Sequence, residues 1–217
     1  MKRLSITLIA FVAIFGIVAI GNTAPITFDD RGAWEAAVGS PDFLVDFNSY
    51  TTDTYFLNSP IDLGPLTIEA TGPDTPSWNL IDTSPFEQSG SANGTPDAYF
   101  YVDDRDDPPL VGKITFDAPV DAWGFDIRNA GNLYALYMDL ETPSGIQTLS
   151  LFEPTSDVFF GVLLYEGMSS ITFRNEYADG FRIDNIAAVT AVPEPSTLLL
   201  IGTGLVGLVG FRRKFRG

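Results

Sequence analysis

Residues 113–131 read KITFDAPVDAWGFDIRNAG, and this stretch decides the fold. Within it, Trp123, Phe125 and Ile127 alternate with Gly124 and Asp126. This period of two is typical of a β-strand that buries one face. The stretch predicts two strands, 110–117 and 120–128, separated by a turn that contains proline.

The same period recurs on both sides of this stretch, between turns rich in Gly, Pro, Asn and Asp. Further strands are predicted at 43–48, 66–70, 78–81, 98–103, 133–140, 146–152, 158–165, 170–174 and 181–189. They do not alternate with helices, so no parallel α/β sheet is indicated. The sequence predicts an all-β fold, a two-sheet antiparallel β-sandwich of the jelly-roll kind.

One short helix is predicted before the strands. Asp30 is its expected N-cap residue, and Trp34, Ala37 and Val38 are expected on one face. It opens a domain predicted at 25–190, a length that fits a single core.

The charge of this domain is strongly negative. The chain has 28 acidic and 12 basic residues, and six of the basic ones lie in the two ends. Only Glu194 among the acidic residues lies there, so the domain holds 27 acidic and 6 basic residues. Such a surface repels nucleic acid and favours cations and neutral or basic partners.

The chain has no Cys and no His. The absence of Cys excludes disulfides and thiolate metal sites, and the absence of His excludes a Ser-His-Asp triad and His-ligated metals. Many catalytic mechanisms are therefore excluded for this chain, and the sequence favours a protein that is not an enzyme.

The N-terminus predicts a signal peptide at 1–24. Lys2 and Arg3 precede an apolar run at 4–20, which is the order that export machinery reads. We expect the mature protein to begin between Asn22 and Pro25. An uncleaved membrane anchor is the alternative, although the run is slightly short to span a bilayer.

The C-terminus predicts a processing signal at 191–217. Pro193, Glu194 and Pro195 precede a predicted transmembrane helix at 197–211, and a basic tail follows. Fifteen residues give about 22 Å of helix, which spans a bilayer with snorkelling of the basic residues. The tail stays in the cytoplasm by the positive-inside rule, so the domain faces outward.

The segment VPEPSTLLLIGTGLVGLVGFRRKFRG resembles the PEP-CTERM sorting signal of exported bacterial proteins associated with exopolysaccharide. The resemblance implies an exosortase as processing partner, with Pro193, Glu194 and Pro195 as its recognition residues. It also implies an inner-membrane-anchored precursor that is then delivered to the cell surface or extracellular matrix. The stretches LVDFNSY and DGFRIDNIAAV, more loosely, are similar to segments of exported domains of carbohydrate-binding-module-like or lectin-like shape.

Two candidate calcium sites follow. FRIDNI at 181–186 looks like the last strand of carbohydrate-binding sandwiches, which implies Asp184 as a calcium ligand with Asp46 and Asn48 as partners. A solvated carboxylate is the alternative for Asp184. Four carboxylates in five residues repel one another, which a Ca²⁺ ion would relieve; a solvated acidic loop is the alternative. These four residues are Asp103, Asp104, Asp106 and Asp107.

Exposed aromatic side chains would bind sugar rings by stacking. The candidates are Trp34, Trp78, Tyr99, Tyr101, Tyr134 and Tyr137. The sequence therefore predicts an exported surface or matrix protein, processed by an exosortase, with polysaccharide and calcium as expected ligands. A secreted polysaccharide hydrolase or lyase with paired carboxylates is the alternative, and a structural matrix protein without a small ligand is a third possibility.

Overall fold

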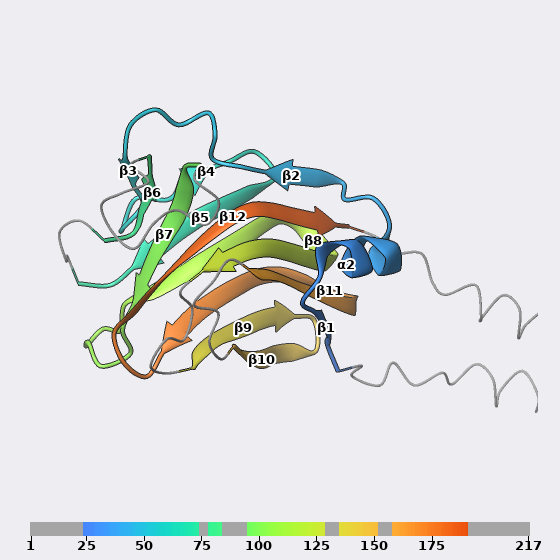
Figure 1. The fold of residues 1–217 in the computed structure, drawn as a ribbon. Helices are drawn as coiled ribbons and strands as arrows, with labels where there is room; N and C mark the ends of the chain where they lie inside the picture. Colours follow the sequence, from blue (N-terminus) through green and yellow to red (C-terminus); the bar gives the residue numbers. More distant parts are fainter. Residues whose placement is uncertain (1–23, 74–77, 84–94, 129–134, 152–157, 191–217) are drawn as a thin grey trace, which may run out of the picture.

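The computed structural model describes residues 24–73, 78–83, 95–128, 135–151 and 158–190. These ranges form one helix and twelve strands in an antiparallel fold (Figure 1). In chain order the elements are β1 (Ile26–Phe28), α2 (Arg31–Val38), β2 (Phe43–Val45), β3 (Thr54–Tyr55), β4 (Ile61–Asp62), β5 (Leu66–Thr71), β6 (Leu80–Asp82), β7 (Asp97–Val102), β8 (Val111–Arg128), β9 (Leu136–Thr142), β10 (Gly145–Leu151), β11 (Val158–Asn175) and β12 (Asp179–Val189).

The strands form two layers, which confirms the predicted sandwich. The first layer has the order β4, β5, the start of β8, the end of β11, β9 and β10. In the second layer, β1 pairs with the start of β11, which is followed by the end of β8, then β12, β7, β6 and β3. Strand β2 pairs with the last part of β12.

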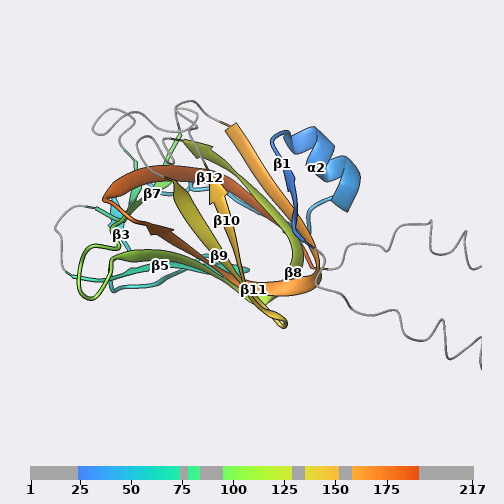
Figure 2. The same cartoon turned by 90° about the horizontal axis from the view of Figure 1, so that it is seen from below.

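The two layers are not separate sheets. Strands β8 and β11 have 18 residues each, and both bend and continue from one layer into the other (Figure 2). The four strands predicted at 110–117, 120–128, 158–165 and 170–174 are therefore two. Register shifts around Met168 and a positive φ of 76° at Gly167 accompany the bend, since a bulge turns a strand without ending it.

The main core lies between the layers. It is formed by the inward residues of each strand, such as Trp123, Phe125 and Ile127 of β8, all of which are buried. The alternation quoted above is thus confirmed. Strands β1, β3 and β4 have two or three residues each and were not predicted, because so short a run shows no period.

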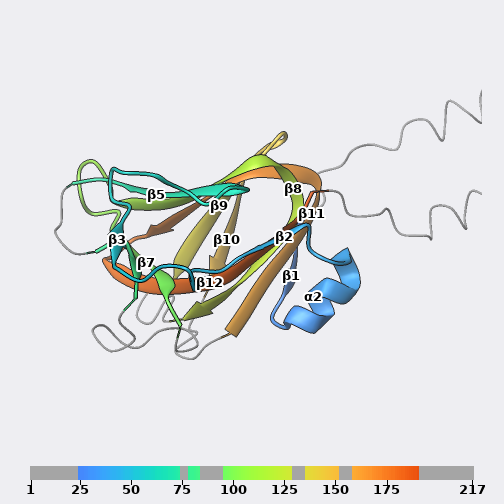
Figure 3. The ribbon, with the colours of Figure 1, turned by 90° about the horizontal axis from the view of Figure 1, so that it is seen from above.

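A second, smaller core lies beneath α2, on the outer face of the second layer (Figure 3). The Asp30 carboxylate accepts a hydrogen bond from the Ala33 N–H at 2.7 Å, so the predicted N-cap is confirmed. Trp34 and Val38 are buried in this core, whereas Ala37 is exposed. The helix therefore covers the part of the outer face formed by β8, β11 and the end of β12, and it does not cover the part formed by β6 and β7.

Candidate aromatic surface and tail signal

Three aromatic side chains meet on the outer face of β6 and β7. Along β7, Phe100 and Val102 point into the core, so Tyr99 and Tyr101 point outward. Trp78 precedes β6, and its ring lies 5.9 Å from Tyr99 and 5.4 Å from Tyr101 between centroids. We call Trp78, Tyr99 and Tyr101 the aromatic cluster. Trp78 and Tyr101 are half-buried, which leaves part of each ring at the surface.

Asn79 holds Trp78 in place. Its side chain donates a hydrogen bond to the Tyr101 carbonyl at 3.1 Å and accepts one from the Tyr101 N–H at 2.9 Å. The amide thus makes the two hydrogen bonds that a neighbouring strand would make with β7. The Asn79 backbone has a φ of 73°. Asn tolerates this left-handed conformation better than most residues. Two hydrogen bonds therefore fix Asn79 to β7, and the indole of the preceding Trp78 makes two ring contacts with the same strand.

A buried ion triad lies beside the cluster. Arg182 of β12 is 1% exposed and donates to Asp97 at 2.5 Å and to Asp82 at 2.7 Å. Its guanidinium carbon lies 4.9 Å from the centre of the Tyr99 ring. Burial raises the pKa of Tyr99 to about 12, although Arg182 opposes the shift. The triad and the aromatic cluster are therefore in contact through Arg182 and Tyr99.

A glycine makes room for the Tyr99 ring. A Cβ atom on Gly180 would lie 2.0 Å from the Tyr99 hydroxyl oxygen, closer than real Cβ contacts come. Gly180 faces Tyr101 in the register between β12 and β7, so it lies directly beneath the aromatic cluster. The position requires glycine because of this close approach.

The charge near the cluster is negative. Asp103 lies two residues after Tyr101, and Arg105 donates to both of its oxygens at 2.9 and 2.7 Å. These hydrogen bonds lower the pKa of Asp103. Burial and the carboxylates of Asp103, Asp106 and Asp179 raise the pKa of Tyr101. The surface can therefore stack against sugar rings and accept hydrogen bonds from their hydroxyls.

The other predicted aromatic residues lie elsewhere. Trp34 is fully buried beneath the helix, and its indole N–H donates to the Val162 carbonyl at 3.3 Å. The Tyr137 ring lies 5.9 Å from the guanidinium carbon of Arg174, on the outer face of the first layer. Tyr134 is outside the described residues. The structure thus brings together three of the six candidates.

In the first set of predicted calcium ligands, one residue is buried and the other two are exposed. Asp184 is fully buried and accepts hydrogen bonds from the Thr95 hydroxyl at 3.2 Å and the Asn185 N–H at 2.7 Å. Its carboxylate is therefore not in solvent. Asp46 and Asn48 are exposed just after β2, and the Asn48 N–H donates to Asp46 at 3.2 Å. Calcium binding by these residues stays a prediction.

The second set lies in the turn between β7 and β8. Asp103 pairs with Arg105, and Asp104 pairs with Arg174 at 3.3 Å. Desolvation raises the pKa of Asp104 despite this pairing. Asp106 is half-buried and Asp107 is exposed. In the described part of the chain, no three or more carboxylates converge as a metal site, and this calcium site also stays a prediction.

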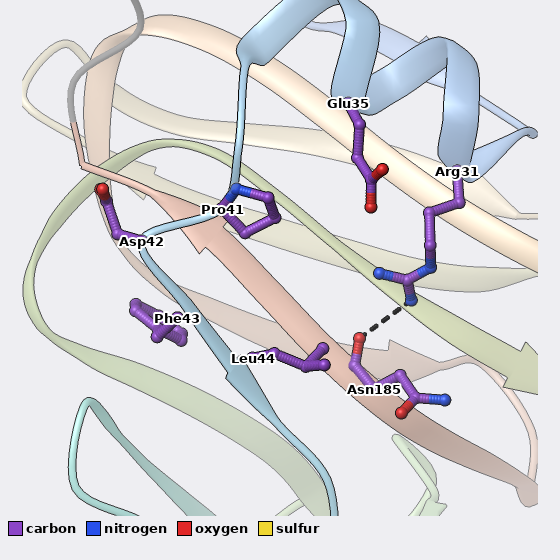
Figure 4. A pocket seen from close by; sticks show the side chains of 7 residues that line it. All are labelled: Arg31, Glu35, Pro41, Asp42, Phe43, Leu44 and Asn185. Carbon is purple, nitrogen blue, oxygen red and sulfur yellow. Dashed lines mark hydrogen bonds between the residues drawn. The ribbon is translucent and has the colours of Figure 1, made fainter.

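A hollow of about 600 Å³ lies between α2 and β2 (Figure 4). Arg31 reaches across it from the helix and donates to the Asn185 carbonyl at 3.0 Å and to Asp126 at 3.1 Å. The apolar part of its lining is Pro41, Phe43 and Leu44. Leu44 is 58% exposed.

The sequence reasoning missed the ion triad and the role of Asn79. Asp82, Asp97 and Arg182 stand at outward positions of their strands, where charged residues normally face solvent. The available signal was spacing: Arg182 stands between the apolar residues Phe181 and Ile183 and shares its face with Asp184. Nothing in the sequence indicates that two distant acidic residues lie against this arginine.

The comparisons with known proteins bear on the tail and on the domain separately. Residues 191–214 match the model of the PEP-CTERM protein-sorting motif. No curated protein matches the chain. Among solved structures, the chain is similar to a mutant of a family 29 carbohydrate-binding module, with 11% identity and a TM-score of 0.30, covering 78% of this chain and 88% of that one.

It is also similar to the family 11 carbohydrate-binding module of the cellulosomal cellulase Lic26A-Cel5E of Clostridium thermocellum. That match has 12% identity and a TM-score of 0.34, and it covers 70% of this chain and 96% of that one. Both scores are low, and the assignment of this chain to the β-sandwiches comes from its own strand registers.

The C-terminal motif and the fold thus define a class, an exported protein with a β-sandwich domain and a C-terminal processing signal. More particularly, the chain carries the PEP-CTERM motif, which indicates a protein that is anchored in the membrane before processing and sorted by an exosortase. The predicted transmembrane helix at 197–211 lies outside the described residues, as does the predicted signal peptide at 1–24 apart from its last residue, Ala24. Within those residues, no helix is long and apolar enough to cross a membrane.

Proposed function

We propose that this protein is a non-enzymatic component of the cell surface or extracellular matrix, whose sandwich domain binds polysaccharide through the aromatic cluster. The sorting motif supports delivery to the outside, with Pro193, Glu194 and Pro195 as the residues that the exosortase reads. Export machinery handles the N-terminus first. The mature domain then meets the polysaccharide that surrounds the cell.

The aromatic cluster is the observation that carries the binding proposal. Sugar rings bind to aromatic faces that are held rigid, since little side-chain entropy is then lost on binding. Trp78 packs against the two tyrosines and directly precedes Asn79, whose side chain is hydrogen-bonded to β7. The Tyr99 ring lies against the Arg182 guanidinium and fills the space above Gly180. The acidic neighbours favour neutral or basic polysaccharides over uronate polymers, because they repel carboxylate groups.

The alternative proposal is a hydrolase or lyase that acts through paired carboxylates. Such an enzyme needs an acid with a raised pKa at the foot of a cleft. Asp104 has a raised pKa, but it is paired with Arg174. It does not line the hollow beside α2, and it does not line a second hollow, which lies beside Asp46 and Asp62. This arrangement favours the binder.

The test is cosedimentation of the mature protein with purified exopolysaccharide from its own host. We expect Trp78→Ala to weaken binding at least tenfold, which corresponds to the loss of one stacked ring. Tyr165→Ala is the matched control, since Tyr165 is exposed on β11 away from the cluster, and its binding should be unchanged. Equal binding by both variants would refute the proposal, and release of new reducing ends by the wild type would favour the enzyme.

A further inference from the structure

The described part of the domain extends to the residue before the sorting motif. The motif match begins at residue 191, and Thr190 is the last described residue. Asp42 holds Thr190 by two hydrogen bonds, from the Thr190 N–H at 2.7 Å and from its hydroxyl at 2.6 Å. The Asp42 N–H in turn donates to the Ala188 carbonyl at 2.9 Å. The start of the motif is therefore tied to a fixed point on the domain.

The chain that joins this point to the recognition residues is short. Pro193 is the third residue after Thr190, and three fully extended residue steps span at most about 11 Å. Thr197, the predicted start of the transmembrane helix, is the seventh residue after Thr190, which gives at most about 25 Å. An enzyme that encloses Pro193, Glu194 and Pro195 therefore meets the end of the domain formed by α2 and β2.

This end of the domain has the character of a contact surface. The hollow beside α2 shares Asp42 with the hydrogen bonds that hold Thr190. Its apolar part is Pro41, Phe43 and the 58% exposed Leu44, and its polar rim includes Glu35 (Figure 4). An apolar centre with a polar rim is the usual composition of a protein interface.

We propose that the hollow between α2 and β2 is a docking site for the sorting enzyme, with Leu44 at its apolar centre and Asp42 as the residue that positions the motif. The enzyme docks while it holds the Pro-Glu-Pro segment, because the short connection brings the two surfaces together. This inference rests on the sorting motif and is independent of any polysaccharide ligand.

The test is pulse-chase processing of the full-length precursor in cells that contain its exosortase. We expect Leu44→Asp to slow processing at least fivefold. Ile146→Asp is the control, because Ile146 is 71% exposed on β10 in the other layer. A second pair of precursors carries eight Gly and Ser residues inserted between Thr190 and Ala191. A long connection separates the two surfaces, so the effect of Leu44→Asp should fall below twofold.

Two outcomes would overturn the docking site. One is processing of Leu44→Asp at the wild-type rate in the native-length precursor. The other is an equal slowing at both lengths, which would indicate a general defect in export or folding. Protease resistance of the precursor domain provides the folding check, and the wild type should be cleaved in every case because the motif itself is intact.

Discussion

Replacement of Arg182 by methionine tests the buried ion triad. Methionine keeps much of the length and the apolar stem of arginine but removes its charge. In the wild type, the guanidinium donates to Asp97, which is 0% exposed, and to Asp82 at 2.5 and 2.7 Å. The variant removes both interactions and leaves two carboxylates in a buried site without this cation.

The magnitude follows from the burial of the site. Removal of one partner of a buried ion pair typically destabilises a protein by about 3–5 kcal/mol. Asp97 and Arg182 are almost completely buried, so we expect a loss of about 3–5 kcal/mol at pH 7.

Urea unfolding of the mature protein at pH 7, followed by circular dichroism, measures this loss. Lys113→Met is the matched control, because Lys113 is a half-buried cation on the outer face of the first layer. It should cost less than about 1 kcal/mol. A loss below about 1 kcal/mol for Arg182→Met would refute the reasoning.

Three further changes have defined outcomes. Gly180→Ala places a methyl group against the Tyr99 hydroxyl, so it should destabilise the domain by about 1–3 kcal/mol in thermal melts and weaken polysaccharide binding along with it. Asp42→Ala removes the hydrogen bonds that lower the pKa of Asp42. Because this group is exposed, we expect the variant to lose only about 0.5–1 kcal/mol of stability at pH 7. The difference from the wild type should disappear as the pH falls below the ordinary aspartate value, which urea unfolding across pH 7 to 3 measures. The predicted calcium site requires that calcium raises the melting temperature of the wild type and not of Asp184→Asn, and a chelator without effect on the wild type would exclude it.

Alternation of apolar and polar residues was enough to predict the fold class. Trp123, Phe125 and Ile127 face the core as their spacing indicates, and the Asp30 cap begins the helix where the sequence places it. The continuity of β8 and β11 could not be predicted, because Pro119 normally marks a strand end. Here it falls within β8, at the bend between the layers, where the strand tolerates it.

The candidate site was only partly predictable. Tyr99 and Tyr101 share a face by period two, so their proximity follows from β7 alone. The approach of Trp78 depends on Asn79, and the burial of Arg182 depends on Asp82 and Asp97 from other strands. Such contacts are set by the pairing of strands that are far apart in the chain, which a single sequence does not encode in any local pattern.

Mass spectrometry of the mature protein from wild-type cells tests most directly whether this chain is exosortase cargo. The sorting motif predicts a C-terminus near Pro193, Glu194 and Pro195, without the apolar run and the basic tail. The N-terminus should lie between Asn22 and Pro25. A mature protein that still ends at Gly217 in cells with an active exosortase would contradict the central claim.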